Sequence, residues 1–158
     1  MSKTDMVRAY AESLLKQILN VDVVSRDQDG DYPVRYKSAL YYVRVDAGSD
    51  DLPVVQVFAI ALAQIARSQE LFEELNTINS RLRLARIFWV ADQVLIESEI
   101  VGEELSLAGF STASEIVGGA ADYYGPRLAT KFGGQTAFAD EEEDDYAPAT
   151  EWRPGLYL

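Results

Sequence analysis

Two glutamates have the spacing in this sequence that comes closest to a catalytic pair. Glu97 and Glu99 stand two residues apart in a segment of alternating polarity, which places both on the same side of a strand. Paired carboxylates can act as acid and base in glycoside cleavage. The sequence favours a plainer explanation, in which these glutamates form cross-strand ion pairs with basic residues on a solvated sheet face. The basic residues available for such pairs are Arg35, Lys37, Arg44 and Arg86.

A second group of carboxylates alternates along a short polar segment. Asp27, Asp29 and Asp31 could converge on a hard cation such as calcium. An EF-hand loop needs glycine at its sixth position and glutamate at its twelfth, whereas here Gly30 is fourth and Ser38 is twelfth. The pattern favours a hairpin turn, in which Gly30 takes a positive φ, over a metal site.

Other catalytic chemistry lacks its usual residues. The chain has no cysteine and no histidine, which removes Cys or Ser-His nucleophiles, zinc fingers and iron–sulfur clusters. Neither a dinucleotide-binding nor a P-loop glycine pattern occurs. We therefore predict no catalytic residue, no cofactor and no metal, and keep a carboxylate-based enzyme acting on an unknown small substrate as the alternative function.

The charge is unevenly distributed over the 158 residues, whose net charge is −12. Residues 1–134 hold 19 acidic and 13 basic side chains, whereas residues 135–158 hold 7 acidic and 1 basic, so each part carries −6. The run at 140–145 is entirely acidic and cannot pack against itself. We predict a folded domain over residues 1–134 followed by an acidic tail over 135–158. The negative charge disfavours nucleic acid and anionic membrane as partners.

Nothing in the sequence resembles a signal peptide or a membrane span. The first five residues lack a basic flank and an apolar core, and the longest apolar stretch is interrupted by Gln56 and Gln64. A cytoplasmic protein is the expectation.

Apolar periodicity and capping residues predict three helices. Residues 4–19 carry an amphipathic stripe. Ser68 is a good N-cap for a second helix, with Leu71, Phe72, Leu75 and Ile78 as its buried stripe. Thr112 and Glu115 predict a capping box for a third helix, which Pro126 should kink or interrupt and which should end at residues 132–134.

Alternating and apolar segments predict six strands, at residues 21–26, 32–37, 39–46, 54–62, 85–90 and 94–101. Their short connections exclude parallel crossovers. The expected fold is α+β, an antiparallel sheet with helices packed mainly on one face, in the order α-β-β-β-β-α-β-β-α. The other face should present its side chains to water or to a partner: Arg35, Lys37, Leu40, Tyr42, Arg44, Glu97 and Glu99.

Several segments resemble a known family. They are residues 29–36 (DGDYPVRY), 42–45 (YVRV), 74–79 (ELNTIN) with 86–89 (RIFW), and the closing FGG at 132–134. Together they are similar to the YbjN-type family, which shares the fold of type III secretion chaperones and is frequent in actinobacteria. The likeness covers about residues 1–134. Lys37 departs from the pattern, in which a small residue or glycine is expected before Ser38.

The resemblance implies a helix-over-sheet module that binds peptides or proteins, has no known catalytic residue, and can form homodimers. We therefore predict a non-catalytic binding module of chaperone, adaptor or regulatory type. The partner should be a protein or peptide held at Tyr42, Arg44, Arg86 and Phe88. Such a surface would capture a segment through apolar patches rimmed by charge or through a sheet edge.

The tail ends on apolar residues after its acidic run. Trp152 and Leu156 are candidates for docking on a partner or on the chain's own domain, and a tail that makes no specific contact is about as well supported. If the tail folds back, it would occupy the site that a partner uses.

Overall fold

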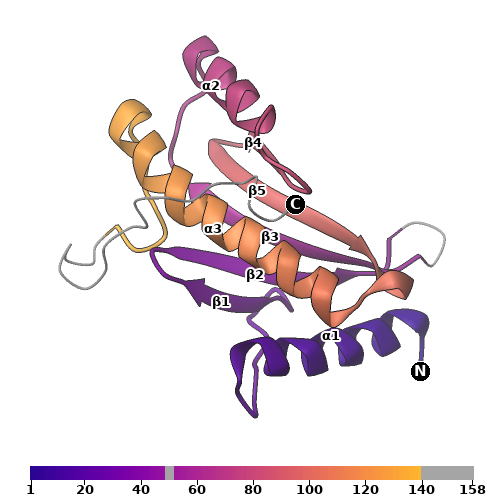
Figure 1. Cartoon of the computed structure of the whole chain (residues 1–158). Helices are drawn as coiled ribbons and strands as arrows, with labels where there is room; N and C mark the ends of the chain where they lie inside the picture. The colour runs from indigo at the N-terminus through magenta and orange to yellow at the C-terminus, as the bar shows by residue number, and fades with distance from the viewer. Residues whose placement is uncertain (49–51, 140–158) are drawn as a thin grey trace.

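The computed structural model of the chain describes residues 1–48 and 52–139. Within these ranges three helices accompany one five-stranded antiparallel sheet (Figure 1). The elements in chain order are α1 (Lys3–Leu19), β1 (Tyr32–Tyr36), β2 (Ala39–Asp46), β3 (Val54–Leu62), α2 (Gln69–Asn79), β4 (Arg86–Val90), β5 (Gln93–Val101), the 3₁₀ turn η1 (Gly102–Glu104) and α3 (Leu107–Phe132). The predicted α+β class is confirmed.

The strands lie in the order β1-β2-β3-β5-β4, so β3 is central. Each β3 residue that faces the helices is fully buried, as Val55, Val57 and Ala59 show. The predicted hairpin connects β4 and β5 through Ala91 and Asp92, both with positive φ. Sequence alternation predicted the faces of β2 and β5 correctly, with Tyr42, Glu97 and Glu99 on the side opposite the buried residues of β3.

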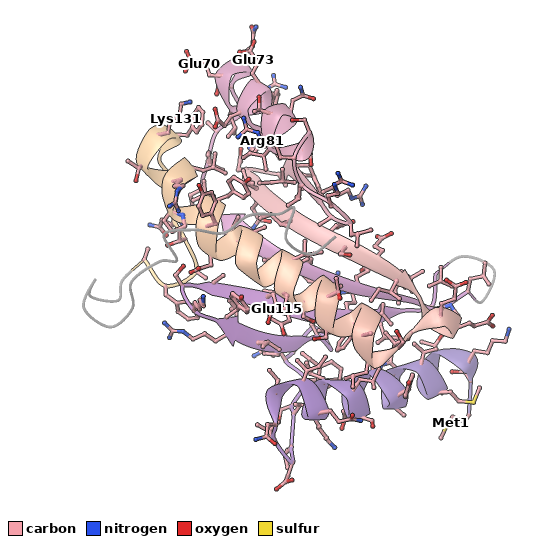
Figure 2. The ribbon with its side chains drawn as sticks, in the orientation of Figure 1. Met1, Glu70, Glu73, Arg81, Glu115 and Lys131 are labelled. Atoms are coloured by element: carbon pink, nitrogen blue, oxygen red, sulfur yellow. The ribbon has the colours of Figure 1, made fainter. Side chains whose placement is uncertain are left out.

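Helix α3 lies across one face of the sheet, over β2, β3 and β5 (Figure 1). Phe110, Ile116 and Val117 of this helix are buried against the inward side chains of the strands. Helix α1 adds Leu14 and Leu15 to the same core, whereas α2 packs against β4. The far end of α3 is linked to α2 by a hydrogen bond of 3.0 Å from Lys131, labelled in Figure 2, to Glu74. The helices consequently cover one face of the sheet and leave the other open.

The strand predicted at residues 21–26 is wrong. These residues follow the left-handed Asn20 that ends α1, and they form no strand. Val23 is 74% exposed, so no second layer or neighbouring strand receives its side chain. The observed order is therefore α-β-β-β-α-β-β-α, with three strands before α2.

The predicted start of the third helix is also wrong. Helix α3 begins at Leu107, where the Ser106 side chain accepts a hydrogen bond from the Gly109 backbone N–H at 3.1 Å. Burial of Phe110 places this earlier turn against the core and favours helix there despite the glycine at 109. Glu115 does not cap the helix, because it accepts a hydrogen bond from the Tyr36 hydroxyl at 2.8 Å.

Pro126 does not interrupt α3, although interruption is one of the two effects expected of it. The helix continues to Phe132, and the Arg127 side chain donates to the Tyr123 carbonyl at 2.8 Å beside the proline. The predicted end is confirmed, since Gly133 forms the C-cap with φ of 84°. In α2 the predicted cap Ser68 is confirmed, but Phe72 is 44% exposed and contacts Trp89 from outside the core.

The turn between β1 and β2 explains how the chain accepts Lys37. This residue takes φ of 53°, the left-handed region in which glycine is favoured. The next residue, Ser38, is held by Asp122 of α3, which accepts hydrogen bonds from the Ser38 backbone N–H and hydroxyl. Because Asp122 is fully buried, these contacts fix the turn against the helix and offset the strain at Lys37.

Tyr32 connects β1 to α1, and it should make the stability of the protein change with pH in the alkaline range. Its buried hydroxyl donates to Glu12 at 2.7 Å, and burial together with this bond raises the pKa of Tyr32 to about 12. The unfolded tyrosine ionises near 10, so the unfolded chain releases this proton first. The contribution of Tyr32 to stability is therefore present below pH 10 and is lost between pH 10 and 12.

We expect Tyr32→Phe to lower the free energy of unfolding by about 1 kcal/mol at pH 7, because it removes one hydrogen bond. The difference in the free energy of unfolding between wild type and Tyr32→Phe should shrink as the pH rises from 10 toward 12. Urea unfolding at a series of pH values measures this difference in the free energy of unfolding. A difference that stays constant from pH 10 to 12 would contradict the raised pKa of Tyr32.

Candidate functional site

The open face of the sheet is the surface opposite the three helices. Half-buried apolar side chains from β2, β3, β4 and β5 form a continuous band across it, which we call the apolar strip: Leu40, Tyr42, Phe58, Ile60, Phe88 and Leu95. Cross-strand pairing places Tyr42 opposite Phe58, and Leu95 opposite both Ile60 and Phe88. A contiguous apolar band on a face without a covering layer is a typical interaction surface.

An aromatic pair forms the middle of the apolar strip. The rings of Tyr42 and Phe58 stack with centroids 5.3 Å apart and an interplanar angle of 20°. Burial raises the pKa of the Tyr42 hydroxyl, and the aspartates at 27, 31 and 29 raise it further. Tyr42 therefore stays neutral at physiological pH, and its hydroxyl can donate a hydrogen bond.

Arg44 lies beside this pair in a fixed position. Its Nε and Nη2 donate to the two carboxylate oxygens of Asp31 at 2.7 Å each, and its guanidinium lies 4.9 Å from the Phe58 ring centroid. The hydrogen bond to Asp31 raises the pKa of Arg44, so the side chain remains a cation. Asp31 is buried, whereas Arg44 is 44% exposed. The arginine thus presents a preorganised charge at the edge of an aromatic surface.

The aspartate segment forms a turn with Gly30 at positive φ, as predicted, but it is not a hairpin turn, because residues 21–26 form no strand. The Asp27 side chain accepts hydrogen bonds of 2.9 Å from the backbone N–H groups of Asp29 and Asp31, and Gly30 has φ of 84°. Carboxylate oxygens of the three aspartates come within 4.8 Å of one another, the distance at which they could hold a cation. Turn hydrogen bonds and the contact with Arg44 already account for the positions of Asp27 and Asp31.

The two glutamates considered for catalysis lie on the open face, and they form ion pairs there with a basic residue, as predicted. Glu97 is paired with Arg86 directly across β4 and β5, and Arg86 lies 4.0 Å from Glu99. Glu99 also accepts a hydrogen bond from Gln56 at 3.1 Å. The bond with Glu97 raises the pKa of Arg86, whose guanidinium lies 5.0 Å from the Phe88 ring centroid. This arrangement forms a charged rim beside the apolar strip.

A hollow of about 260 Å³ lies at the β2–β3 end of the strip. Its walls combine strip residues Leu40, Tyr42 and Ile60 with residues 135–137, which follow α3. Glu97 and Glu99 do not line it. A second hollow of about 380 Å³, between β5 and the start of α3, is lined by Glu99 but not by Glu97. Neither hollow brings the two glutamates together at its base.

The outer edge of β4 is occupied by a side chain of the chain itself. Asn79, the last residue of α2, donates to the Ile87 carbonyl at 2.8 Å and accepts from the Ile87 N–H at 2.9 Å. The amide thus pairs with Ile87 as the backbone of a neighbouring strand would.

The structure places all four predicted partner-binding residues, Tyr42, Arg44, Arg86 and Phe88, on the open face. Sequence reasoning missed Phe58, Ile60 and Leu95. These residues lie on β3 and β5 and complete the apolar strip between β2 and β4. The sequence of 54–62 contained the signal, because it is apolar at every position except Gln56 and so places apolar side chains on both faces of a strand. The candidate tail-docking residues Trp152 and Leu156 lie outside the described residues.

The fold and this surface define a helix-covered antiparallel sheet with one face available for binding. A family model described as T3SS (YopN, CesT) and YbjN peptide-binding chaperone 1, TY-Chap1, matches residues 5–140. The chain belongs to this family, which confirms the resemblance seen in the sequence, and the family is one of peptide-binding chaperones.

A solved structure supports the fold. A chain in the crystal structure of the ExsC–ExsE complex is similar with a TM-score of 0.61 at 14% sequence identity. The match covers 81% of this chain and 97% of that chain. None of the curated proteins compared matches the sequence. Over residues 1–48 and 52–139, none of the helices is long and apolar enough to cross a membrane.

Proposed function

We propose that this chaperone binds an extended peptide or protein segment on the open face of its sheet, without catalysing a reaction. The observation that carries the proposal is the apolar strip, whose stacked Tyr42 and Phe58 are flanked by arginines already held by carboxylates. Fixed aromatic rings bind with little loss of side-chain entropy, and arginines held in place require little reordering when a partner binds. The partner should therefore be a segment with apolar side chains at alternate positions.

The enzyme alternative is weaker in this geometry. Glu97 is engaged by Arg86, and its side chain is 12% exposed, whereas Glu99 is about half exposed. In a retaining or inverting glycosidase, both catalytic carboxylates must face the same substrate. The charged rim of a binding surface accounts for both residues.

Three further expectations from the sequence belong to this proposal. The protein acts in the cytoplasm, it can form a homodimer, and neither nucleic acid nor membrane is its partner. The net charge of −12 supports the last of these.

A peptide display experiment tests the proposed surface. Random dodecapeptides are selected on the purified full chain, and one selected peptide is synthesised with a fluorophore for anisotropy titration. The double variant Tyr42→Ala/Phe58→Ala should bind this peptide at least about tenfold more weakly, since truncating two interface aromatics removes more than about 1.4 kcal/mol.

A matched control uses the same residue types elsewhere on the surface. Tyr10 and Phe72 are 47% and 44% exposed, on α1 and α2. The variant Tyr10→Ala/Phe72→Ala should bind the peptide within about twofold of wild type, because neither residue contributes to the open face. Equal weakening by both double variants, or failure of the library to yield any binding peptide, would contradict the proposal.

A further inference from the structure

The chain that follows α3 turns back onto the sheet. Gly133 and Gly134 have φ of 84° and 89°, and a side chain at Gly134 would meet the Ala63 carbonyl oxygen at 2.9 Å. This close approach lets Gln135 pair with Ala63, just beyond β3, through two backbone hydrogen bonds of 2.8 and 2.9 Å. The segment is therefore attached to the sheet at one end of the apolar strip.

The next residues contact the open face itself. Residues 135–137 line the hollow together with Leu40, Tyr42 and Ile60 of the apolar strip. Phe138 is half-buried, with its ring centroid 3.9 Å from the Arg35 guanidinium of β1. Four residues of the chain's own C-terminal segment thus already lie against the surface to which we assign peptide binding.

The sequence after Ala139 has the chemistry to continue over this surface. It begins with six acidic residues at 140–145 and ends with apolar and aromatic residues that include Trp152 and Leu156. The open face presents the cations Arg35, Arg44 and Arg86 around the apolar strip. The apolar end of the segment therefore matches the apolar strip, and its acidic run can approach Arg44 and Arg86, whose side chains stay 44% and 63% exposed although Asp31 and Glu97 already pair with them.

The length of the segment is sufficient for this contact. Nineteen residues follow Ala139, and an extended chain spans roughly 3.3 Å per residue, or about 60 Å. Crossing from β1 to β4 requires only about 20 Å at the usual spacing of about 4.8 Å between strands.

We propose that residues 135–158 act as an internal ligand of the open face, which peptide must displace in order to bind. This inference rests on the proposed function and adds a regulation of the same site. Because the internal ligand is tethered, its effective concentration is on the order of millimolar, so even weak contacts compete with a free peptide. Salt should weaken the acidic part of this competition.

Photocrosslinking in the full chain tests the seating of the tail without any added peptide. The photoreactive residue p-benzoylphenylalanine replaces Phe58 in one protein and Phe72, on α2, in the control. Irradiation should join position 58 to residues within 140–158, as read by mass spectrometry, and position 72 should give at least about fivefold less of this product. Equal yields, or no crosslink from position 58 into 140–158, would overturn the proposal.

Peptide affinity separates this inference from the proposed function. The variant Glu141→Gln/Glu142→Gln/Glu143→Gln should bind a selected dodecapeptide about three- to tenfold more tightly than wild type at low salt. The control Glu70→Gln/Glu73→Gln/Glu104→Gln removes the same charge from exposed positions on α2 and η1. It should change affinity by less than about twofold.

The outcomes are distinguishable. If Tyr42→Ala/Phe58→Ala weakens peptide binding while Glu141→Gln/Glu142→Gln/Glu143→Gln leaves it unchanged, the proposal of an internal ligand is wrong and the proposed site on the open face stands. If Tyr42→Ala/Phe58→Ala has no effect on peptide binding, the proposed site itself fails.

Discussion

Replacing Arg44 by alanine should lower the free energy of unfolding by about 3 kcal/mol, because it leaves the buried carboxylate of Asp31 without its cation. Asp31 is 4% exposed at its side chain and receives both hydrogen bonds of 2.7 Å from Arg44. Removing one partner of such a pair costs more than the pair contributes, since the remaining charge loses its compensating partner.

The opposite substitution should cost less. Asp31→Ala leaves Arg44 without its carboxylate, but that side chain is 44% exposed and can turn toward water. Lys3→Ala is the control for an exposed ion pair, because Lys3 and Glu103 are 53% and 59% exposed. It should cost about 0.5 kcal/mol or less. Urea unfolding at pH 7 measures all three, and an Arg44→Ala effect no larger than that of Lys3→Ala would contradict the assignment.

Gly118→Val should lower the free energy of unfolding by about 3 kcal/mol through overpacking. Helix α3 approaches β1 so closely at this residue that a Cβ would lie 2.7 Å from Cγ of the Tyr36 ring. The clash involves the ring atoms nearest the Tyr36 backbone, which move little when the side chain rotates, so a small rotamer adjustment does not relieve it. Tyr36 is also held by its hydrogen bond to Glu115, labelled in Figure 2.

A double variant tests whether the ring is the cause. Tyr36→Ala removes the two nearest clashing atoms, Cγ and Cδ2, so Gly118→Val should cost at least about 1 kcal/mol less in that background than in wild type. Urea unfolding of the four proteins in the cycle gives the coupling energy. A purely additive result would show that Gly118→Val acts through something other than the contact with Tyr36.

Local sequence pattern predicted those parts of the fold that depend on alternation and capping. Strand β2 shows a regular two-residue period in its sequence, and Ser68 caps α2 as expected. The failures involve tertiary contacts. Val21 and Val23 favour a strand by local propensity, but no neighbouring strand pairs with them. The true start of α3 depends on burial of Phe110, which a local pattern does not reveal.

The candidate site was predictable to a similar extent. Alternation placed Tyr42 and Arg44 on the open face, because residues of even spacing share a side of a strand. It could not show that Asp31 binds Arg44, since that contact depends on how the turn before β1 lies against β2. Likewise, the approach of Phe138 to Arg35 depends on two left-handed glycines at the end of α3.

The pairing of Asn79 with Ile87 bears on how the protein avoids aggregation. An exposed edge strand is a template on which unfolded chains can add strands and begin cross-β growth. One side-chain amide occupies both the donor and the acceptor of Ile87, and so breaks the ladder of hydrogen bonds that an incoming strand would need. The edge that Asn79 protects belongs to the same sheet as the proposed peptide-binding face, so the fold can offer that face to a peptide while it keeps unwanted chains off this edge.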